Sequence, residues 1–146
     1  MITNEREYRI TRHWLAGFER TATTPVAEER TDAHPRIRQA MREAAESEAE
    51  VLRDQVRRYE QLRDGEITSW EAESLRELPH VLKEARVAAG LTQRELAQRL
   101  GTAAQQVQRW EASDYRGVGL DRVQDVADAL GLQIRETIAY AARAGC

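Results

Sequence analysis

The chain has 146 residues, a net charge of −3 and one cysteine. This length allows one ordinary domain or a small domain with an extension, and the acidic balance excludes binding to nucleic acid through overall charge alone. No internal disulfide is possible. No apolar run reaches membrane-spanning length and the first residues lack a signal-peptide centre, so we expect a cytoplasmic protein without membrane contact.

The beginning of the chain alternates Tyr8 and Ile10, which predicts a short extended piece. Thr11 then fits the N-cap of a helix that carries Trp14 and Phe18 on one side. Two large aromatic side chains on a short helix need a partner. That partner is either the long helix that follows or another protein.

From Pro35 to Arg63 no glycine or proline interrupts the chain, which predicts one long helix that ends before Gly65. Its apolar stripe is narrow and rich in alanine. The stripe consists of Met41, Ala45, Ala49, Leu52, Val56 and Tyr59. Such a helix cannot bury itself, so it pairs with the short helix before it or with a second copy of itself.

Residues 67–78 read as a connector in which Ser69 caps a further helix. Trp70 is interpreted as a core aromatic that docks the two parts of the chain, with a ligand site as the alternative. Pro79 then opens another helix, and Gly90 ends it.

The next stretch predicts two short helices joined by a tight turn. Thr92 and Glu95 form a capping box, which places the first helix start directly after Thr92. Gly101 ends that helix, and Thr102 fits the cap of the second one, residues 102–111.

The second of these helices has a polar outer face that would make a poor core. Its members are Ala104, Gln105, Gln106, Gln108 and Arg109. Glutamine can pair with adenine and arginine with guanine, while a small side chain lets the helix approach the bases. Two helices joined by a glycine-containing turn, the second with such a face, predict a helix-turn-helix unit that reads the major groove.

Two more helices are expected after this unit. Leu120, Val123, Val126, Ala127 and Leu130 line the first, which ends at Gly131. Ile134, Ile138 and Ala141 suit a second.

Residues 78–139 resemble the helix-turn-helix domain of the phage repressor and Cro family, also called the XRE family. The matching motifs are LKEAR at 82–86, GLTQRELAQRLG at 90–101, VQRWE at 107–111 and VADALGL at 126–132. The resemblance implies five helices around one core and a phosphate contact from Gln93. It assigns base reading to Ala104, Gln105, Gln106 and Arg109. A longer loop, residues 114–119, stands where the family usually has Asn-Gly after Glu111.

Phosphate contacts are expected from Gln93, Thr102 and Arg116, because any basic surface must be local. Between residues 86 and 116 five arginines face three acids, a local excess of two. No catalytic, cofactor or metal residues are expected. His13, His34 and His80 stand far apart without a catalytic or metal-binding spacing, so we do not expect an enzyme.

The sequence therefore predicts an all-α protein with an N-terminal helical extension, residues 1–66, and a helix-turn-helix domain, residues 67–146 with its core at 78–139. We expect a sequence-specific regulator of transcription that binds double-stranded DNA, acting as a dimeric repressor. The alternative is an antitoxin of a two-gene toxin system, similar to the HigA type, whose N-terminal region binds a toxin. A third reading is a helix-turn-helix scaffold used for protein contacts only.

Overall fold

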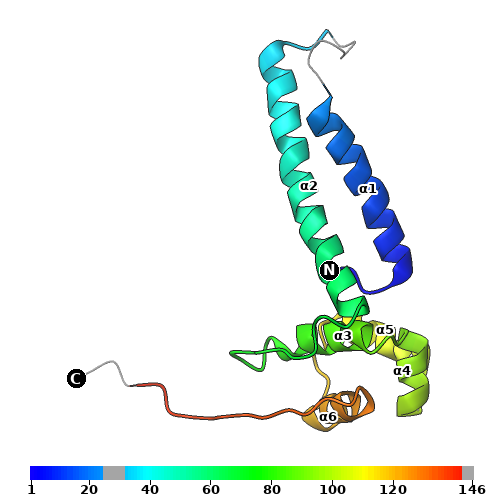
Figure 1. Cartoon of the computed structure of the whole chain (residues 1–146). Helices are drawn as coiled ribbons and strands as arrows, with labels where there is room; N and C mark the ends of the chain where they lie inside the picture. Colours follow the sequence, from blue (N-terminus) through cyan, green and yellow to red (C-terminus); the bar gives the residue numbers. More distant parts are fainter. Residues whose placement is uncertain (25–31, 143–146) are drawn as a thin grey trace. The chain divides into compact units, whose positions relative to one another are not determined.

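The computed structural model describes residues 1–24 and 32–142, and within these residues it contains six α-helices and no strand (Figure 1). The chain divides into two compact units, Met1–Thr92 and Gln93–Cys146. The all-α fold with an N-terminal helical region is confirmed. The predicted domain boundary at residues 66–67 stays a prediction. No helix in the described ranges combines the length and apolar character needed to cross a membrane.

The first unit begins with α1, Glu5–Thr23, so the predicted extended piece is wrong. Asn4 rather than Thr11 is the N-cap: its side chain accepts from the backbone N–H of Glu7 at 2.9 Å, and the Glu7 carboxylate accepts from the N–H of Thr3 at 2.7 Å. These two bonds start the helix before the apparent alternation. Of the two alternating residues, only Tyr8 is buried.

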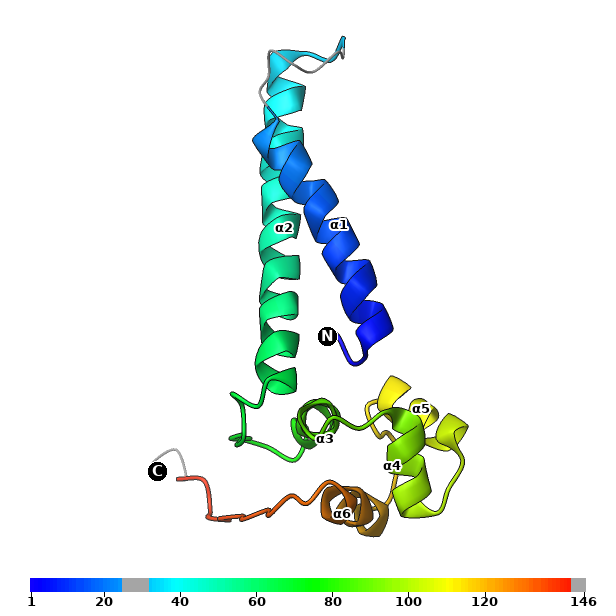
Figure 2. The same cartoon turned by 45° about the vertical axis from the view of Figure 1, so that its right-hand side comes forward.

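The long helix α2, Pro35–Arg63, has the predicted bounds. Gly65 follows it with φ +76°, a conformation that suits glycine. Helices α1 and α2 run antiparallel and pack along each other (Figures 1 and 2), so the long helix pairs with the short helix before it. The contact includes Ala45 and Ala49, both buried, but Met41 is exposed and does not take part in it. Small alanine side chains make this contact close but modest in area.

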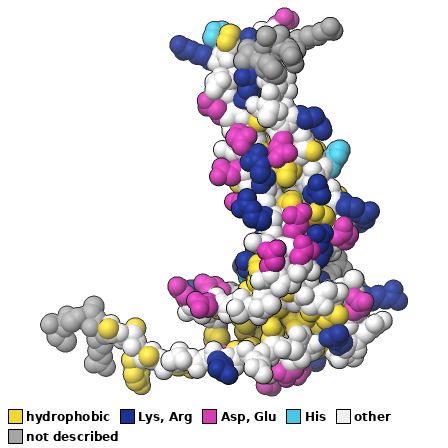
Figure 3. Space-filling model, viewed as in Figure 1, with side chains coloured by type: hydrophobic (Ala, Val, Ile, Leu, Met, Phe, Trp, Pro, Cys, Tyr) yellow, Lys and Arg dark blue, Asp and Glu magenta, His cyan; other side chains and the backbone are white. Residues whose placement is uncertain are grey.

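Charged side chains of both signs are interspersed over the α1–α2 hairpin (Figure 3). Arg53 of α2 donates to Glu19 of α1 at 2.9 Å and to Glu46 at 3.1 Å. Exposed ion pairs of this kind contribute little to stability, so the hairpin depends mainly on its apolar stripe.

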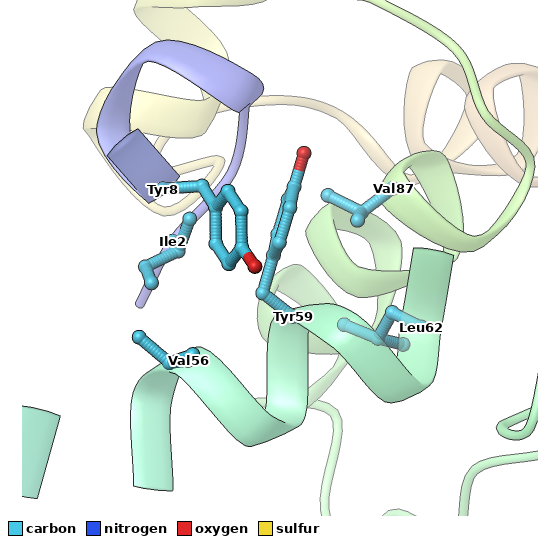
Figure 4. Packing of buried hydrophobic residues seen from close by; sticks show 6 residues of the cluster. All are labelled: Ile2, Tyr8, Val56, Tyr59, Leu62 and Val87. Carbon is cyan, nitrogen blue, oxygen red and sulfur yellow. The ribbon is translucent and has the colours of Figure 1, made fainter. Parts of the chain in front are cut away.

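A buried hydrophobic cluster lies where the ends of α1 and α2 meet α3, Leu78–Ala88. Tyr8 and Tyr59 stack there with ring centroids 5.0 Å apart. Figure 4 shows the buried cluster, formed by Ile2, Tyr8, Val56, Tyr59, Leu62 and Val87. It joins the hairpin to the next helix along the chain.

Trp70 packs against this cluster and its indole N–H donates to Glu84 at 2.7 Å. Arg58 also donates to the Glu84 carboxylate, at 2.6 and 2.8 Å. The interpretation of Trp70 as a core aromatic is therefore confirmed within this unit. The helix expected after Ser69 is absent: residues 69–72 are irregular, and residues 73–77 form a bend and a turn that lead into α3.

The second unit contains α4, Gln93–Leu100, α5, Ala104–Ala112, and α6, Leu120–Ala129. Its fully buried side chains come from all three helices. They are Leu96, Ala97, Val107, Val126 and Ala127. Arg99 also ties α4 to the end of α6, donating to the carbonyl of Ala129 at 3.1 Å, where the helix dipole favours a cation.

Two expectations for the end of the chain are wrong. Leu120 is 73% exposed, because it is the first residue of α6 and lies outside the buried stripe. Residues 133–142 contain no helix, so the predicted fifth helix of the domain is absent from the described residues. Ile134, Thr137, Ile138 and Tyr140 are β-branched or aromatic, and such residues favour extended chain over helix.

Candidate nucleic-acid interface

A tight turn between α4 and α5 sets the geometry of the candidate site. Gly101 adopts φ +64°, its N–H donates to the carbonyl of Gln98, and the N–H of Thr102 donates to that of Ala97 at 3.0 Å. This pattern satisfies the last carbonyls of α4 and turns the chain, as the sequence predicts from Gly101. Helix α5 then packs on α4, with Leu96 and Val107 both completely buried.

Helix α5 has one buried and one exposed side. Val107 and Glu111 are buried, and Trp110 and Gln106 are partly covered at the edge. The exposed side chains stand on a contiguous arc of the helix, at spacings of one, three and four residues. They are Ala104, Gln105, Gln108, Arg109 and Ala112. Four of the five residues expected to read bases therefore share one exposed face, and Gln106 lies at its edge.

The polar side chains of this face are available for intermolecular hydrogen bonds. Among the described residues, Gln105, Gln108 and Arg109 make no side-chain hydrogen bond or ion pair. Two amides and a guanidinium can donate to base edges, and the amides can also accept. The face therefore offers the chemistry of direct base readout without having to break internal bonds.

The three residues expected to contact phosphates lie in different settings. Gln93 is half-buried in the first turn of α4, and its amide Nε2 donates to Glu111 Oε2 at 2.7 Å. Thr102 is half-buried in the turn but is not the cap of α5: the N-cap is Ala103, without a side-chain hydrogen bond. Arg116 is exposed in the loop that follows α5.

That loop is anchored by Tyr115, which the sequence analysis did not single out. Asp114 and Tyr115 both have positive φ values, 51° and 55°, and the Tyr115 N–H donates to the carbonyl of Trp110 at 2.7 Å. The Tyr115 side chain is buried, with its ring 6.3 Å from that of Trp110. An aromatic residue in a long polar loop is the signal that could have revealed this anchor. It fixes the chain directly before Arg116.

The described ranges give little support for a metal-binding site. Residues 1–24 and 32–142 contain no group of three or more histidine, cysteine or carboxylate side chains arranged to hold a metal ion. An open surface hollow of about 320 Å³ is lined by Arg6, Arg9, Ile10 and His13 of α1.

A family model described as helix-turn-helix matches residues 82–136. No match was found among the curated proteins or among the solved structures. The matched segment begins in α3 and contains the turn and helix α5 described above. The family is one of DNA-binding regulatory domains and not of enzymes. Residues 82–136 therefore match a helix-turn-helix domain of the XRE type, a domain found in DNA-binding regulators.

Proposed function

We propose that this protein is a dimeric repressor that reads the major groove of double-stranded DNA with the exposed face of α5. The observation that carries the proposal is the pair Gln105 and Arg109, which are exposed and uncommitted on the helix that follows the turn. Arg109 would pair with guanine and Gln105 with adenine. Gln108 and Ala104 would complete the contact, with Gln106 at its edge.

Phosphate contacts would fix the register of the helix in the groove. Gln93 opens α4, Thr102 precedes α5 and Arg116 follows it, so the three residues flank the reading helix along the chain. Such contacts position a protein without carrying sequence information. The chain is acidic overall, so these local contacts would supply the salt-dependent part of the affinity.

The dimer follows from the size of the reading surface. One recognition helix contacts only a few base pairs, which is too little to single out a site in a genome. Two copies would read two half-sites about one helical turn, roughly 34 Å, apart. Such a repressor would act in the cytoplasm.

The experiment is selection of bound DNA from a random double-stranded library with the purified full chain. The proposal expects an enriched site with two related halves spaced by about 10 base pairs. Affinity should fall linearly on a log–log scale as salt rises. Enrichment of no sequence, together with salt-independent binding, would contradict the proposal and favour a scaffold that contacts proteins only.

A second candidate function is that of an antitoxin that binds a toxin through the N-terminal hairpin and represses its own operon. The exposed side of α1 favours it. Trp14 is 60% exposed and Ile10 is about half exposed. Ile10 lines a surface hollow with Arg6, Arg9 and His13, and the Trp14 ring lies 6.2 Å from the ring of His13. Of the two partners considered for Trp14, the long helix does not bury it, and this large apolar side chain is available to another protein.

This second candidate is tested by the neighbouring gene. A small reading frame beside this one, whose product co-purifies with the chain and loses binding in Trp14→Ala but not in Met41→Ala, would support it. Met41 is a matched control because it is equally exposed on the other helix of the hairpin. Equal binding by both variants would exclude this surface.

A further inference from the structure

The side of α1 that faces away from α2 carries basic and apolar side chains. Helix α2 packs along the other side of α1 (Figures 1 and 2). Residues spaced by three, four or seven positions share one face of a helix, and we call this one the basic face of α1. It extends over about four turns, roughly 21 Å. Its exposed members are Arg6, Arg9, Ile10, His13, Trp14 and Arg20.

The positive charge of this face is not balanced within the chain. The three carboxylates of α1 all accept hydrogen bonds inside the first unit, Glu5 from Tyr59, Glu7 from Thr3 and Glu19 from Arg53. Three arginines of the face form no side-chain hydrogen bond or ion pair with any residue in the described ranges. These are Arg6, Arg9 and Arg20. A face with free cations and engaged carboxylates favours a partner of negative charge.

The apolar part of the face has the spacing of a contact between two helices. Four residues follow one another at intervals of four, three and four positions, the heptad pattern of a helix–helix seam. They are Ile10, Trp14, Gly17 and Thr21. The flank of this seam carries a basic residue at every seventh position, where paired helices place complementary charges. The flanking residues are Arg6, His13 and Arg20.

Gly17 indicates close approach of another backbone at the middle of the seam. Glycine inside a helix is less favourable than alanine. A Cβ at this position would meet only the end of the Arg20 side chain, at 3.8 Å, so no described contact requires glycine there. The hydroxyl of Thr21 already donates to the Gly17 carbonyl at 3.2 Å, so it leaves no polar group in need of a partner. A second helix packed against Gly17 would explain the glycine.

We propose that the basic face of α1 binds an acidic amphipathic helix of a second protein. The apolar side chains of that helix would pack on Ile10 and Trp14 beside Gly17, and its carboxylates would pair with Arg6 and Arg20. The inference rests on the partner-binding role proposed above for the hairpin, and it names the chemistry of the partner.

Nucleic acid is also anionic but fits this face less well. Phosphates would pair with the arginines and leave the apolar seam uncovered. The first turn of α1 also contains Glu5 and Glu7, which repel phosphate. An acidic helix can supply apolar and charged contacts together, so it matches both parts of the face.

Selection from a peptide display library tests the proposal with the full chain. The peptides are about three heptads long, with leucine fixed along the seam and the flanking positions randomised among glutamate, lysine, serine and alanine. The wild-type chain should enrich glutamate at the flanking positions. Arg6→Glu/Arg20→Glu should enrich lysine there instead and bind the acidic peptide at least about tenfold more weakly, because like charges would then face each other.

A matched control and an uncharged variant complete the test. Arg36→Glu/Arg57→Glu makes the same change of charge at exposed positions of α2 and should enrich the same peptides as the wild-type chain. Gly17→Leu should keep the helix content measured by circular dichroism, because leucine favours helix. It should also bind the acidic peptide at least about tenfold more weakly, because its side chain fills the space for the partner backbone.

Several results would overturn the inference. These are a wild-type chain that enriches no acidic peptide, a charge-reversed variant that enriches the same peptides as wild type, and full affinity in Gly17→Leu. If Arg6→Glu/Arg20→Glu weakens binding to double-stranded DNA as strongly as binding to the peptide, the face binds nucleic acid. If the same variant loses self-association in sedimentation, the face belongs to an interface between two copies.

The outcomes separate this inference from the proposed functions. A product of the neighbouring gene that binds Arg6→Glu/Arg20→Glu as well as wild type would support the antitoxin function and overturn the inference. An enriched acidic peptide without any co-purifying neighbour would support the inference and contradict the antitoxin function. DNA selection by a chain that enriches no acidic peptide would overturn the inference and leave the reading function of α5 intact.

Discussion

The side-chain amide of Gln93 donates a 2.7 Å hydrogen bond to the carboxylate of Glu111, which is only 5% exposed. Gln93 is the first residue of α4 and Glu111 lies near the end of α5. The bond therefore connects the two helices of the helix-turn-helix unit at a second point besides their turn. It holds a residue expected to contact phosphate in a fixed position.

Removal of this bond should loosen the unit. Gln93→Ala should lower the free energy of unfolding by about 1.5–3 kcal/mol, the range for a hydrogen bond to a charged group. Glu111→Ala should cost more, because Glu111 makes further interactions. Urea unfolding of both single variants and the double variant measures their coupling. Gln105→Ala, on the exposed face, is the control and should change stability by less than about 0.5 kcal/mol. Additive effects of the two variants would show that the bond is not stabilising.

Glycine-to-alanine substitutions at Gly101 and at Gly17 should change the stability of the chain in opposite directions. Gly101→Ala should destabilise the chain by about 1–2 kcal/mol, because φ is +64° and a Cβ there is strained although it meets no atom within 4 Å. Gly17→Ala, inside α1, should stabilise it by up to about 1 kcal/mol, since alanine favours helix and the new Cβ makes only ordinary contact with Arg20. Thermal unfolding compares the two. A stable Gly101→Ala variant would contradict the turn geometry.

The buried carboxylate of Glu84 predicts a dependence of stability on pH. Burial raises its pKa, but the hydrogen bonds from Arg58 and Trp70 and the charges of Arg58 and His80 lower it by more, so the pKa lies below its ordinary value. A carboxylate with a lowered pKa stabilises the fold above its unfolded pKa, about 4.3, and loses that contribution as the pH falls through the folded value.

The comparison with Glu84→Gln isolates this contribution. Between neutral pH and pH 5 the wild-type chain should be the more stable, and the difference should shrink as acid is added below about pH 4.3. Urea unfolding across this range measures it. Glu43→Gln, on an exposed part of α2, is the control and should follow the wild-type curve. A constant difference at all pH values would show that Glu84 does not titrate as described.

The exposed and buried apolar residues of the hairpin should respond differently to truncation. Trp14→Ala should change the free energy of unfolding by less than about 0.5 kcal/mol, because the side chain is mainly in solvent. Leu62→Ala should cost about 2–5 kcal/mol, because this residue is fully buried in the cluster of Figure 4. Similar losses in the two variants, measured by thermal unfolding, would contradict the assignment of Trp14 to an exposed surface.

Much of the fold follows from local chemistry in the sequence. Pro35, Gly65, Gly90 and Gly101 mark helix ends where the structure has them, because proline and glycine act on the backbone directly. The face of α5 was also predictable, since one buried residue, Val107, fixes which side of a short helix is exposed.

The incorrect or missing predictions arise where two local sequence signals compete, or where a residue distant in the sequence supplies the contact. Both Asn4 and Thr11 are suitable N-cap residues, but α1 begins after Asn4, so Thr11 lies inside the helix. Spacing of Ile134 and Ile138 by four residues fits a helix, but residues 133–142 are extended and their β-preferring types are the better guide. The hydrogen bonds of Glu84 and Glu111 come from distant residues, and no local pattern reports them.

The most direct measurement of the central claim compares Arg109→Ala with Arg116→Ala in DNA selection and in binding to the wild-type site. Arg109→Ala should lose about 1–3 kcal/mol on that site and relax the preference at one position of each half. Arg116→Ala should weaken binding to all sequences equally and reduce the salt slope by about one unit. If Arg109→Ala selects the same site with undiminished affinity, the exposed face of α5 does not read DNA.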